Sequence, residues 1–427
     1  MMEKQFYPEV GETLYKGTLS NGLQIIVLPR SGFTKKLCYF VTDFGAIHRQ
    51  FTMDGKDYTV PAGIAHYLEH KLFDMPGRDV TEEFAKLGAS PNAFTSYDMT
   101  AYYFSCTEHF QENLRLLLEF VSTPYFTEQS VAKEQGIIGQ EIGMNEDNPD
   151  SVLFELLAET MYENHPIQTP ILGTRESIAQ ITPEVLHACH KAFYRPDNML
   201  LCAVGDIDPA EVEALAKDVL QNVPCPKVTA QRQWEEDLVV KKPYVTRAME
   251  VSMPMFQLGF KSQPLPNGDD GVRQEIIGDM AAEALFGESS KLYLRLYNEG
   301  LIDSSFGGGF ETIEGMSMLI ASGDSEDPQA VANAILQEAK ALAETGISQE
   351  DFLRMKRSAL GRRIRGIDSF ESTCFRLCAY HFSKFDYFRI PQIYSDVTKE
   401  EIKTFIKDVV TEDRMCLAVI TPIKEEA

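Results

Sequence analysis

The apolar residues of this chain fall into two kinds of pattern, one typical of buried strands and one typical of helices. The runs LCYFVTDFGA at 37–46 and MPMFQLGFKS at 253–262 are short and mostly apolar, as expected for buried strands. The stretches 61–76 and 277–292 are longer and read as helices. The chain is therefore predicted to mix strands and helices along its whole length.

The same patterns recur at one offset of 216 residues, about half of the chain. The segment 182–204 reads as a capped helix, a turn and an apolar strand. The segment 398–420 reads the same way and is identical to it at six of 23 positions. Chance could produce one such match, but three matches at one offset indicate a duplicated domain.

The point where the two copies meet is marked by breaking residues. An amphipathic helical run, PAEVEALAKDVL, is followed by NVPCPK and then by a polar stretch. We predict a first domain over 1–225, a linker over 226–243 and a duplicated domain over 244–427. The predicted fold is α+β, with two duplicated α/β sandwich domains, each a mostly antiparallel sheet covered by helices.

Composition narrows the range of partners. The 427 residues include 40 Lys+Arg and 64 Asp+Glu, which gives a formal net charge of −24. An acidic protein repels phosphate backbones and anionic lipids, so we expect no nucleic-acid partner and no membrane partner. The sequence has no run of 18 apolar residues and no apolar segment near its start, and its eight cysteines read as free thiols. We therefore expect a cytoplasmic protein.

The first half contains HYLEH at 66–70, within a segment that reads as a helix. Residues four apart on a helix differ by about 40° in direction, so His66 and His70 project together, as two ligands of one metal must. Glu69 lies on the same side of the helix. A zinc hydrolase needs three protein ligands and an open position for water, so a third ligand must come from another element. A solvated helix with this spacing by chance is the alternative.

A second helical segment, SVAKEQGIIGQEIGMN at 130–145, offers two candidates for the third ligand. Glu134 and Glu141 are two turns apart in a sector that also holds Val131, Ile137, Ile138, Ile142 and Met144. A carboxylate among apolar side chains costs several kcal/mol unless a cation or a metal compensates it. Both carboxylates can thus reach one site. The alternative for Glu134 is an ordinary carboxylate on the helix surface. Glycines on the opposite side of this helix predict tight packing there.

The HYLEH motif, the run NAFTSYDMTAYYF at 92–104 and the E-x6-E spacing together resemble the insulinase/pitrilysin family of zinc metallopeptidases, nearest to its bacterial YmfH-type branch. The resemblance covers nearly the whole chain and implies the half-clamshell fold of that family. It implies that His66, His70 and Glu141 bind Zn2+. It also implies that Glu69 is the general base and that Glu134 orients a ligand residue without itself binding the metal.

The NAFTS segment resembles the family's edge strand, which pairs with the backbone of a peptide substrate. Asn92, Ala93 and Phe94 are therefore candidate substrate-binding residues, and an ordinary paired strand is the alternative. The resemblance implies a zinc endopeptidase that cleaves short unfolded peptides inside a closed chamber. If part of the acidic surplus lines that chamber, basic peptides should be preferred.

The second copy of the domain lacks the metal motif, because at the same offset the motif falls on Ala282, Leu285 and Phe286. Family active sites also receive an Arg and a Tyr from the far side of the chamber. Here Tyr297 stands at the Arg position and the Tyr position falls near Asp303.

The nearby Arg295 is an alternative source of positive charge. We therefore expect a heterodimer in which a sister subunit supplies the Arg/Tyr pair, with a homodimer as the alternative for the isolated chain. Two other functions stay open, a non-catalytic peptide-binding or scaffold subunit and a dedicated maturase of a single partner.

Overall fold

The structure, a computed structural model, describes residues 2–423 and divides into two compact units. Of the described residues, the first unit comprises 2–142, 170–231 and 364–389. The second comprises 143–169, 232–363 and 390–423. Each unit thus contains one segment from the other half of the sequence. A single division of the chain at 226–243 does not account for these two segments.

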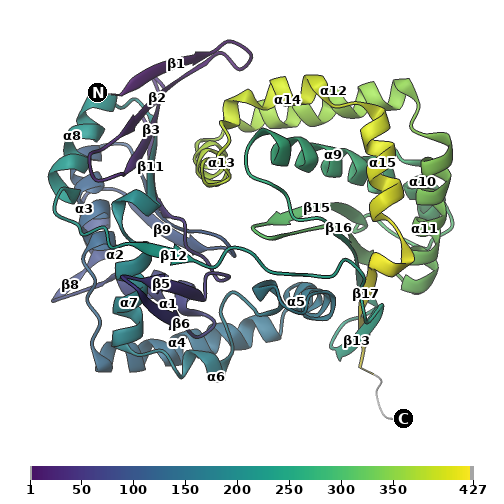
Figure 1. Cartoon of the computed structure of the whole chain (residues 1–427), viewed down its shortest axis with the longest axis horizontal. Helices are drawn as coiled ribbons and strands as arrows, with labels where there is room; N and C mark the ends of the chain where they lie inside the picture. Colours follow the sequence, from purple (N-terminus) through teal and green to yellow (C-terminus); the bar gives the residue numbers. More distant parts are fainter. Residues whose placement is uncertain (1, 424–427) are drawn as a thin grey trace. The chain divides into compact units, whose positions relative to one another are not determined.

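In the described part of the chain, the first unit is built on a seven-stranded sheet with the order β1-β2-β3-β11-β4-β10-β9 (Figure 1). Every neighbouring pair is antiparallel except β3 and β11. β9 therefore forms one edge of the sheet. The strands are β1 (Glu3–Tyr7), β2 (Glu12–Thr18), β3 (Gln24–Pro29), β4 (Lys36–Thr42), β9 (Ser90–Thr95), β10 (Thr100–Cys106) and β11 (Met199–Gly205).

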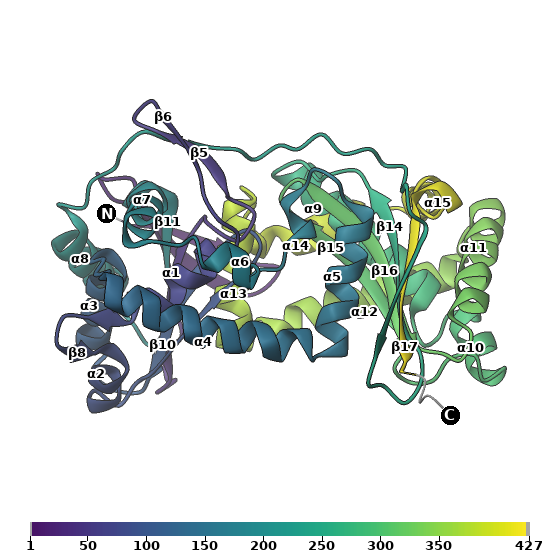
Figure 2. The ribbon, with the colours of Figure 1, turned by 90° about the horizontal axis from the view of Figure 1, so that it is seen from below.

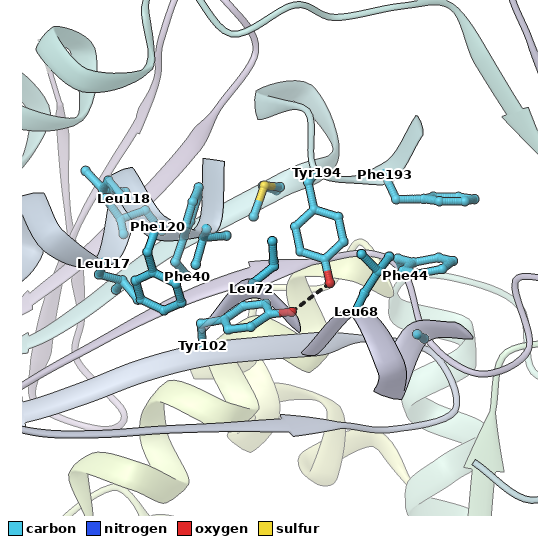
Figure 3. Close-up of a cluster of buried hydrophobic side chains, with 14 of the residues drawn as sticks. Phe40, Phe44, Leu68, Leu72, Tyr102, Leu117, Leu118, Phe120, Phe193 and Tyr194 are labelled. Carbon is cyan, nitrogen blue, oxygen red and sulfur yellow. Dashed lines mark hydrogen bonds between the residues drawn. The ribbon is translucent and has the colours of Figure 1, made fainter. Parts of the chain in front are cut away.

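Helices on one face of this sheet enclose the core of the first unit. The phenol groups of Tyr102 and Tyr194 share a 2.8 Å hydrogen bond within an otherwise apolar cluster that includes Phe40 and Phe120 (Figure 3). This hydrogen bond gives each of the two buried phenol groups a polar partner. The helices that the first half of the sequence contributes to this unit are α1 (Ile64–Leu72), α2 (Val80–Lys86), α3 (Phe110–Ser122), α4 (Glu128–Glu146), α6 (Arg175–Ile178), α7 (Pro183–Phe193) and α8 (Pro209–Leu220).

Two small sheets complete the first unit. Their strands are β5 (Gln50–Met53), β6 (Lys56–Thr59) and β12 (Val228–Ala230) in one, and β7 (Asp74–Met75) and β8 (Arg78–Asp79) in the other. β12 comes from the predicted linker and pairs with β5. Part of the predicted linker therefore belongs to the first unit.

The second unit repeats the core of the first. Over the described residues its sheet has the order β13-β17-β14-β16-β15, and only β13 and β17 are parallel. In the first unit, the strands β3-β11-β4-β10-β9 show the same succession of one parallel and three antiparallel pairs. This agreement between the two sheets confirms the predicted duplication. The strands are β13 (Tyr244–Met249), β14 (Met255–Ser262), β15 (Gly307–Ile313), β16 (Met316–Asp324) and β17 (Met415–Pro422).

The predicted helix–turn–strand segments are confirmed in both copies. The hydroxyl groups of Thr182 and Thr398 accept hydrogen bonds from the first turns of α7 and of α15 (Lys399–Val409), so each helix begins at an N-cap. β11 and β17 follow these helices. The helices that the second half of the sequence contributes to the second unit are α9 (Asp269–Phe286), α10 (Lys291–Asn298), α11 (Pro328–Thr345), α12 (Gln349–Gly366), α14 (Ile390–Asp396) and α15 (Lys399–Val409).

The two copies exchange one helix each, which explains why the compact units differ from the predicted division. α5 (Pro149–Met161), from the first half of the sequence, lies against β14 and β17, on the opposite side of that sheet from α11 and α15 (Figure 2). Gly259 of β14 gives room to this helix, because a side chain there would meet Met161. α13 (Phe370–Phe382), from the second half, lies against β4 and β11. Among residues 2–423, no helix combines the length and apolarity needed to cross a membrane.

Candidate metal centre

α1 carries both histidines and the glutamate of the HYLEH motif. Its first turn follows Gly63, which has a φ of +86° and whose added Cβ would lie 2.4 Å from the carbonyl oxygen of Leu172. Only glycine suits that backbone without strain. Ile64, Leu68 and Leu72 are buried in the core, and Figure 3 shows Leu68 and Leu72 within it. The opposite side of α1 therefore presents the motif.

Three candidate ligands converge between α1 and α4. His66 Nε2 lies 3.5 Å from Glu141 Oε1, and His70 Nε2 lies 3.6 Å from Glu141 Oε2. The ligand atoms of the three residues all lie within 4.8 Å of one another. Two imidazole nitrogens and one carboxylate oxygen form a donor set typical of a catalytic zinc site, so the residues fit this metal. The hydrogen bond to His66 chiefly lowers the pKa of Glu141, as a ligand carboxylate requires.

Glu134 holds His70 from the side away from Glu141. Its Oε1 lies 3.0 Å from His70 Nδ1, an arrangement that fixes the orientation of a ligand imidazole. Burial alone would raise the pKa of Glu134, but His70 and the Lys71 charge outweigh it and lower that pKa. His66 lacks such support, since its Nδ1 is buried with no hydrogen-bond partner among the described residues.

Glu69 is buried beside the converging ligands. Burial raises the pKa of its carboxyl group, although the hydrogen bond from Thr95 opposes this shift. Thr95 Oγ1 donates that hydrogen bond to Glu69 Oε2 over 2.6 Å. A carboxylate with a raised pKa and a fixed orientation is suited to accept a proton near neutral pH.

The apolar sector of α4 is less buried than we predicted. Ile137 is 44% exposed and Met144 is 72% exposed, so they border Glu141 on an open surface, whereas Ile138 and Ile142 face the core. The predicted tight packing of the glycine side is wrong. An added Cβ at Gly136 or Gly139 would meet nothing within 4 Å. α4 is therefore anchored by only part of its apolar face.

The three candidate substrate-binding residues lie on β9, at the edge of the sheet. Asn92 is exposed, and its Oδ1 accepts a hydrogen bond from the Ala93 amide. The Phe94 ring lies near Tyr39 and Phe375, on the face of the sheet that meets α13. The side chain of Phe94 therefore points away from the metal ligands, and the backbone of β9 is the part that stays available to an extended peptide.

In the second unit, an ion-pair cluster lies between α9 and α12, the helices that correspond in order to α1 and α4. Arg363 Nη2 lies 2.8 Å from Glu275 Oε1 and 2.8 Å from Asp279 Oδ2. The residues at the positions of the HYLEH motif, Ala282 and Leu285 among them, are buried in α9. A guanidinium group between two carboxylates is a structural arrangement, not a metal site.

The region where family members present an Arg and a Tyr is also visible in the second unit. Tyr297 lies on α10 and is 52% exposed, and its ring stacks on Tyr293. Arg295 is exposed on the same helix. Asp303 follows α10, and its carboxylate accepts a hydrogen bond from the Ser305 amide. None of these side chains reproduces the Arg/Tyr pair at the two positions that the resemblance identifies.

Two residues of the site were missed by sequence reasoning. Thr95 orients Glu69, and Lys71 approaches Glu134 from the side opposite His70. A threonine at the end of a strand carries no signal of its own. A lysine that directly follows the candidate ligand His70 and precedes the apolar pair Leu72 and Phe73 was a usable signal, because lysine is seldom buried without a partner.

Known protein families and curated proteins match most of this chain. The model of the insulinase family (peptidase family M16) matches residues 56–175, and that of the peptidase M16 inactive domain matches residues 180–359. The protein named uncharacterized zinc protease YmfH, of Bacillus subtilis (strain 168), is 37% identical over 425 residues, 97% of this chain and 98% of that protein. YmxG, a zinc protease of the same strain, is 26% identical over 373 residues, 84% and 88% of the two chains.

Solved structures show the same fold. An M16-like peptidase from Alicyclobacillus acidocaldarius has a TM-score of 0.91 and 29% identity, and the match covers 99% of both chains. A protease from Helicobacter pylori has a TM-score of 0.80 at 19% identity, with 96% of this chain and 99% of that chain covered, and shows the fold alone. These matches confirm the predicted two-domain α+β architecture.

Proposed function

This chain belongs to the insulinase family of peptidases (family M16), and we propose that it is a zinc-dependent metalloendopeptidase of short unfolded peptides. The observation that carries the proposal is the convergence of His66, His70 and Glu141 beside the buried carboxylate of Glu69. The zinc proteases that resemble this chain over most of its length support the metal and the reaction class.

In this proposal the chain's own residues bind the metal and move the proton. His66, His70 and Glu141 would hold the zinc, and Glu134 would keep His70 in its binding orientation. Bound zinc supplies Lewis acidity, which polarises a carbonyl group and lowers the pKa of water towards about 7. Glu69 accepts the proton of the attacking water and then delivers it to the leaving amine.

The edge strand β9 provides a place for the substrate. An extended peptide that adds to this edge would form backbone hydrogen bonds with the segment that includes Asn92 and Ala93. Such pairing gives affinity without reading a particular sequence, which suits a peptidase of varied peptides. Thr95 ends the same strand and contacts Glu69, so the substrate strand and the base are directly connected.

We further propose that the working enzyme is a heterodimer located in the cytoplasm. The exposed Tyr297 and the hydrogen-bonded Asp303 stand where family members present an Arg and a Tyr, so a sister subunit would have to supply that pair. A scaffold subunit and a maturase of one partner are the competing functions. The intact metal motif argues against the scaffold.

The test combines metal analysis with peptide cleavage. The full chain and its Glu69→Gln variant are compared for zinc content and for cleavage of a peptide mixture, each alone and with a co-encoded sister chain. We expect one zinc per chain in both proteins, and cleavage that is restored by the sister chain and lost in the variant. Bound zinc without Glu69-dependent cleavage in any combination would overturn the enzyme proposal in favour of a scaffold.

Two further outcomes separate the remaining alternatives. If the isolated chain cleaves the mixture as fast as the combined chains, the heterodimer proposal is wrong. If only one protein encoded nearby is cut while the peptide mixture stays intact, the chain is a maturase.

A further inference from the structure

Lys71 is a fully buried lysine directly beside the proposed metal site. Its side chain has 0% exposure, although it follows His70 in the chain and lies at the end of α1. Burying a lysine is costly unless nearby groups compensate its charge and bind its hydrogens. The function proposed above assigns no task to this residue.

The surroundings of Lys71 are acidic. Its Nζ bonds the carboxylate of Asp74, donates a 3.3 Å hydrogen bond to the carbonyl oxygen of Ser130, and lies 3.8 Å from Glu134 Oε2. Half of the Asp74 side chain is in solvent, so this carboxylate does not need a buried cation. Glu134 is the partner that does, because its side chain is almost fully buried.

The two oxygens of Glu134 therefore have separate partners. Oε1 faces His70 Nδ1 at 3.0 Å, and Oε2 faces Lys71 Nζ at 3.8 Å. With one cationic or donor group at each oxygen, the carboxylate plane cannot rotate without losing one of them. Lys71 is not the only residue that anchors α1 to α4, because the Tyr67 hydroxyl also donates a hydrogen bond to the backbone of α4, at the Val131 carbonyl.

The charges of the site lead to the same conclusion. Three carboxylates gather here, those of Glu69, Glu134 and Glu141. A divalent metal offsets two of these negative charges, and Lys71, which also pairs with Asp74, is the buried cation nearest to the third, Glu134. Removing Lys71 would leave the mostly buried Glu134 with His70 and the charge of Lys133 as its remaining compensation, which is unfavourable.

We propose that Lys71 is a positioning residue of the metal centre, which holds Glu134 against His70 and thereby strengthens zinc binding. This inference rests on the proposed function, since it presumes that the site takes zinc. Lys71 acts through Glu134 and touches neither substrate nor metal.

The experiment measures zinc affinity in the full chain by competition with a chelating dye at fixed pH. The variants are Lys71→Met, Glu134→Gln and the double variant. Methionine keeps the length of the side chain and removes its charge. Lys191→Met is the matched control, because this lysine of α7 is exposed and its ion pair with Asp54, at 3.9 Å, includes none of the candidate site residues.

We expect Lys71→Met to bind zinc about 10-fold more weakly than the wild type, the lower end of the effect of such supporting contacts. If Lys71 works through Glu134, the double variant should bind zinc within twofold of Glu134→Gln alone. Lys191→Met should bind like the wild type. Thermal unfolding of the metal-free proteins, with Lys71→Gln as a second variant, shows whether a loss of affinity reflects misfolding.

Several results would overturn the inference. Unchanged or tighter zinc binding by both folded Lys71 variants would show that Lys71 does not support the site. Losses that multiply in the double variant would show that it does not act through Glu134. A wild-type chain that takes up no zinc would instead overturn the proposed function itself, so the two failures are distinguishable.

Discussion

The hydroxyl group of Thr95 donates a 2.6 Å hydrogen bond to Oε2 of Glu69, and thus joins the edge strand β9 to the proposed general base on α1. Thr95 Oγ1 also accepts a 3.4 Å hydrogen bond from Thr100 on the neighbouring strand β10. The orientation of Glu69 is therefore set by the sheet and not by α1 alone. A peptide that pairs with β9 would contact the same strand that holds the base.

Replacing Thr95 by valine should slow catalysis without weakening substrate binding. Valine has nearly the same shape but cannot orient the carboxylate, so we expect kcat to fall about 10-fold with KM and zinc content unchanged. Thr95→Ser keeps the hydroxyl group and should retain most of the activity. Steady-state kinetics of the two variants test this.

The control for Thr95 is Thr52→Val, which also removes a 2.6 Å hydrogen bond from a threonine to a carboxylate, here to Asp57 on the β5–β6 hairpin. Its kcat should equal that of the wild type. A Thr95→Val enzyme with unchanged kcat, or with a raised KM alone, would contradict the positioning role.

Gly63→Ala should disturb the metal centre. An alanine at a φ of +86° is strained, and its Cβ would collide with the carbonyl oxygen of Leu172, which is 2.4 Å away. The start of α1 must then shift, and the histidines shift with it. We expect a lower melting temperature and weaker zinc binding. A variant as stable as the wild type, with the same zinc affinity, would contradict this account of the α1 start.

Gly136→Ala, in contrast, should stabilise the protein. This glycine lies within α4, where an added Cβ meets nothing within 4 Å. Because alanine favours the helix over glycine by about 1 kcal/mol, the free energy of unfolding should rise by up to that amount. Urea denaturation measures it. A clear loss of stability would mean that this side of α4 is covered after all, as its glycines first indicated.

Arg363→Met should destabilise the second unit. The substitution removes the guanidinium group that the carboxylates of Glu275 and Asp279 share. The Asp279 side chain keeps 36% exposure, so solvent screens part of the penalty and we expect a loss of about 2 kcal/mol. Unfolding by urea tests this.

The matched control is Arg362→Met, which removes an arginine whose side chain is 50% exposed from its pair with Glu283. Exposed pairs contribute at most about 1 kcal/mol, so this variant should be the more stable of the two. Equal losses in both variants would show that burial of the Arg363 cluster does not matter.

His190 should make the stability of the first unit depend on pH. Burial lowers the pKa of His190 to about 4, although the hydrogen bond that its Nε2 donates to the Val121 carbonyl over 2.9 Å opposes the shift. An unfolded histidine titrates near 6.5. Between pH 6.5 and about 4 the unfolded chain therefore binds a proton that the folded chain excludes, so stability is complete above pH 6.5 and falls as the pH is lowered.

The measurement compares the wild type with His190→Gln, which has no such proton. At pH 5 the wild type should have lost about 2 kcal/mol more of its pH 7 stability than the variant. His187→Gln, at an exposed position on the same helix, should follow the wild type. Identical pH dependence of wild type and His190→Gln would contradict the prediction.

Much of the fold could be predicted from the sequence, because the duplication repeats local patterns. The capped helix before β11 and the one before β17 share turn chemistry and apolar spacing, which do not depend on the rest of the chain. The exchange of α5 and α13 could not be predicted in this way. It depends on which apolar surfaces are complementary in three dimensions, such as Gly259 beside Met161.

The same division holds for the metal centre. The sequence by itself determined that His66 and His70 project together with Glu69 beside them, because helix geometry relates residues three and four positions apart. Only the tertiary structure decided that Glu134, 64 residues after His70, meets its Nδ1, and that Lys71 is buried behind that carboxylate. The physical reason is that contacts between distant segments follow from packing, which the local periodicity of a sequence does not contain.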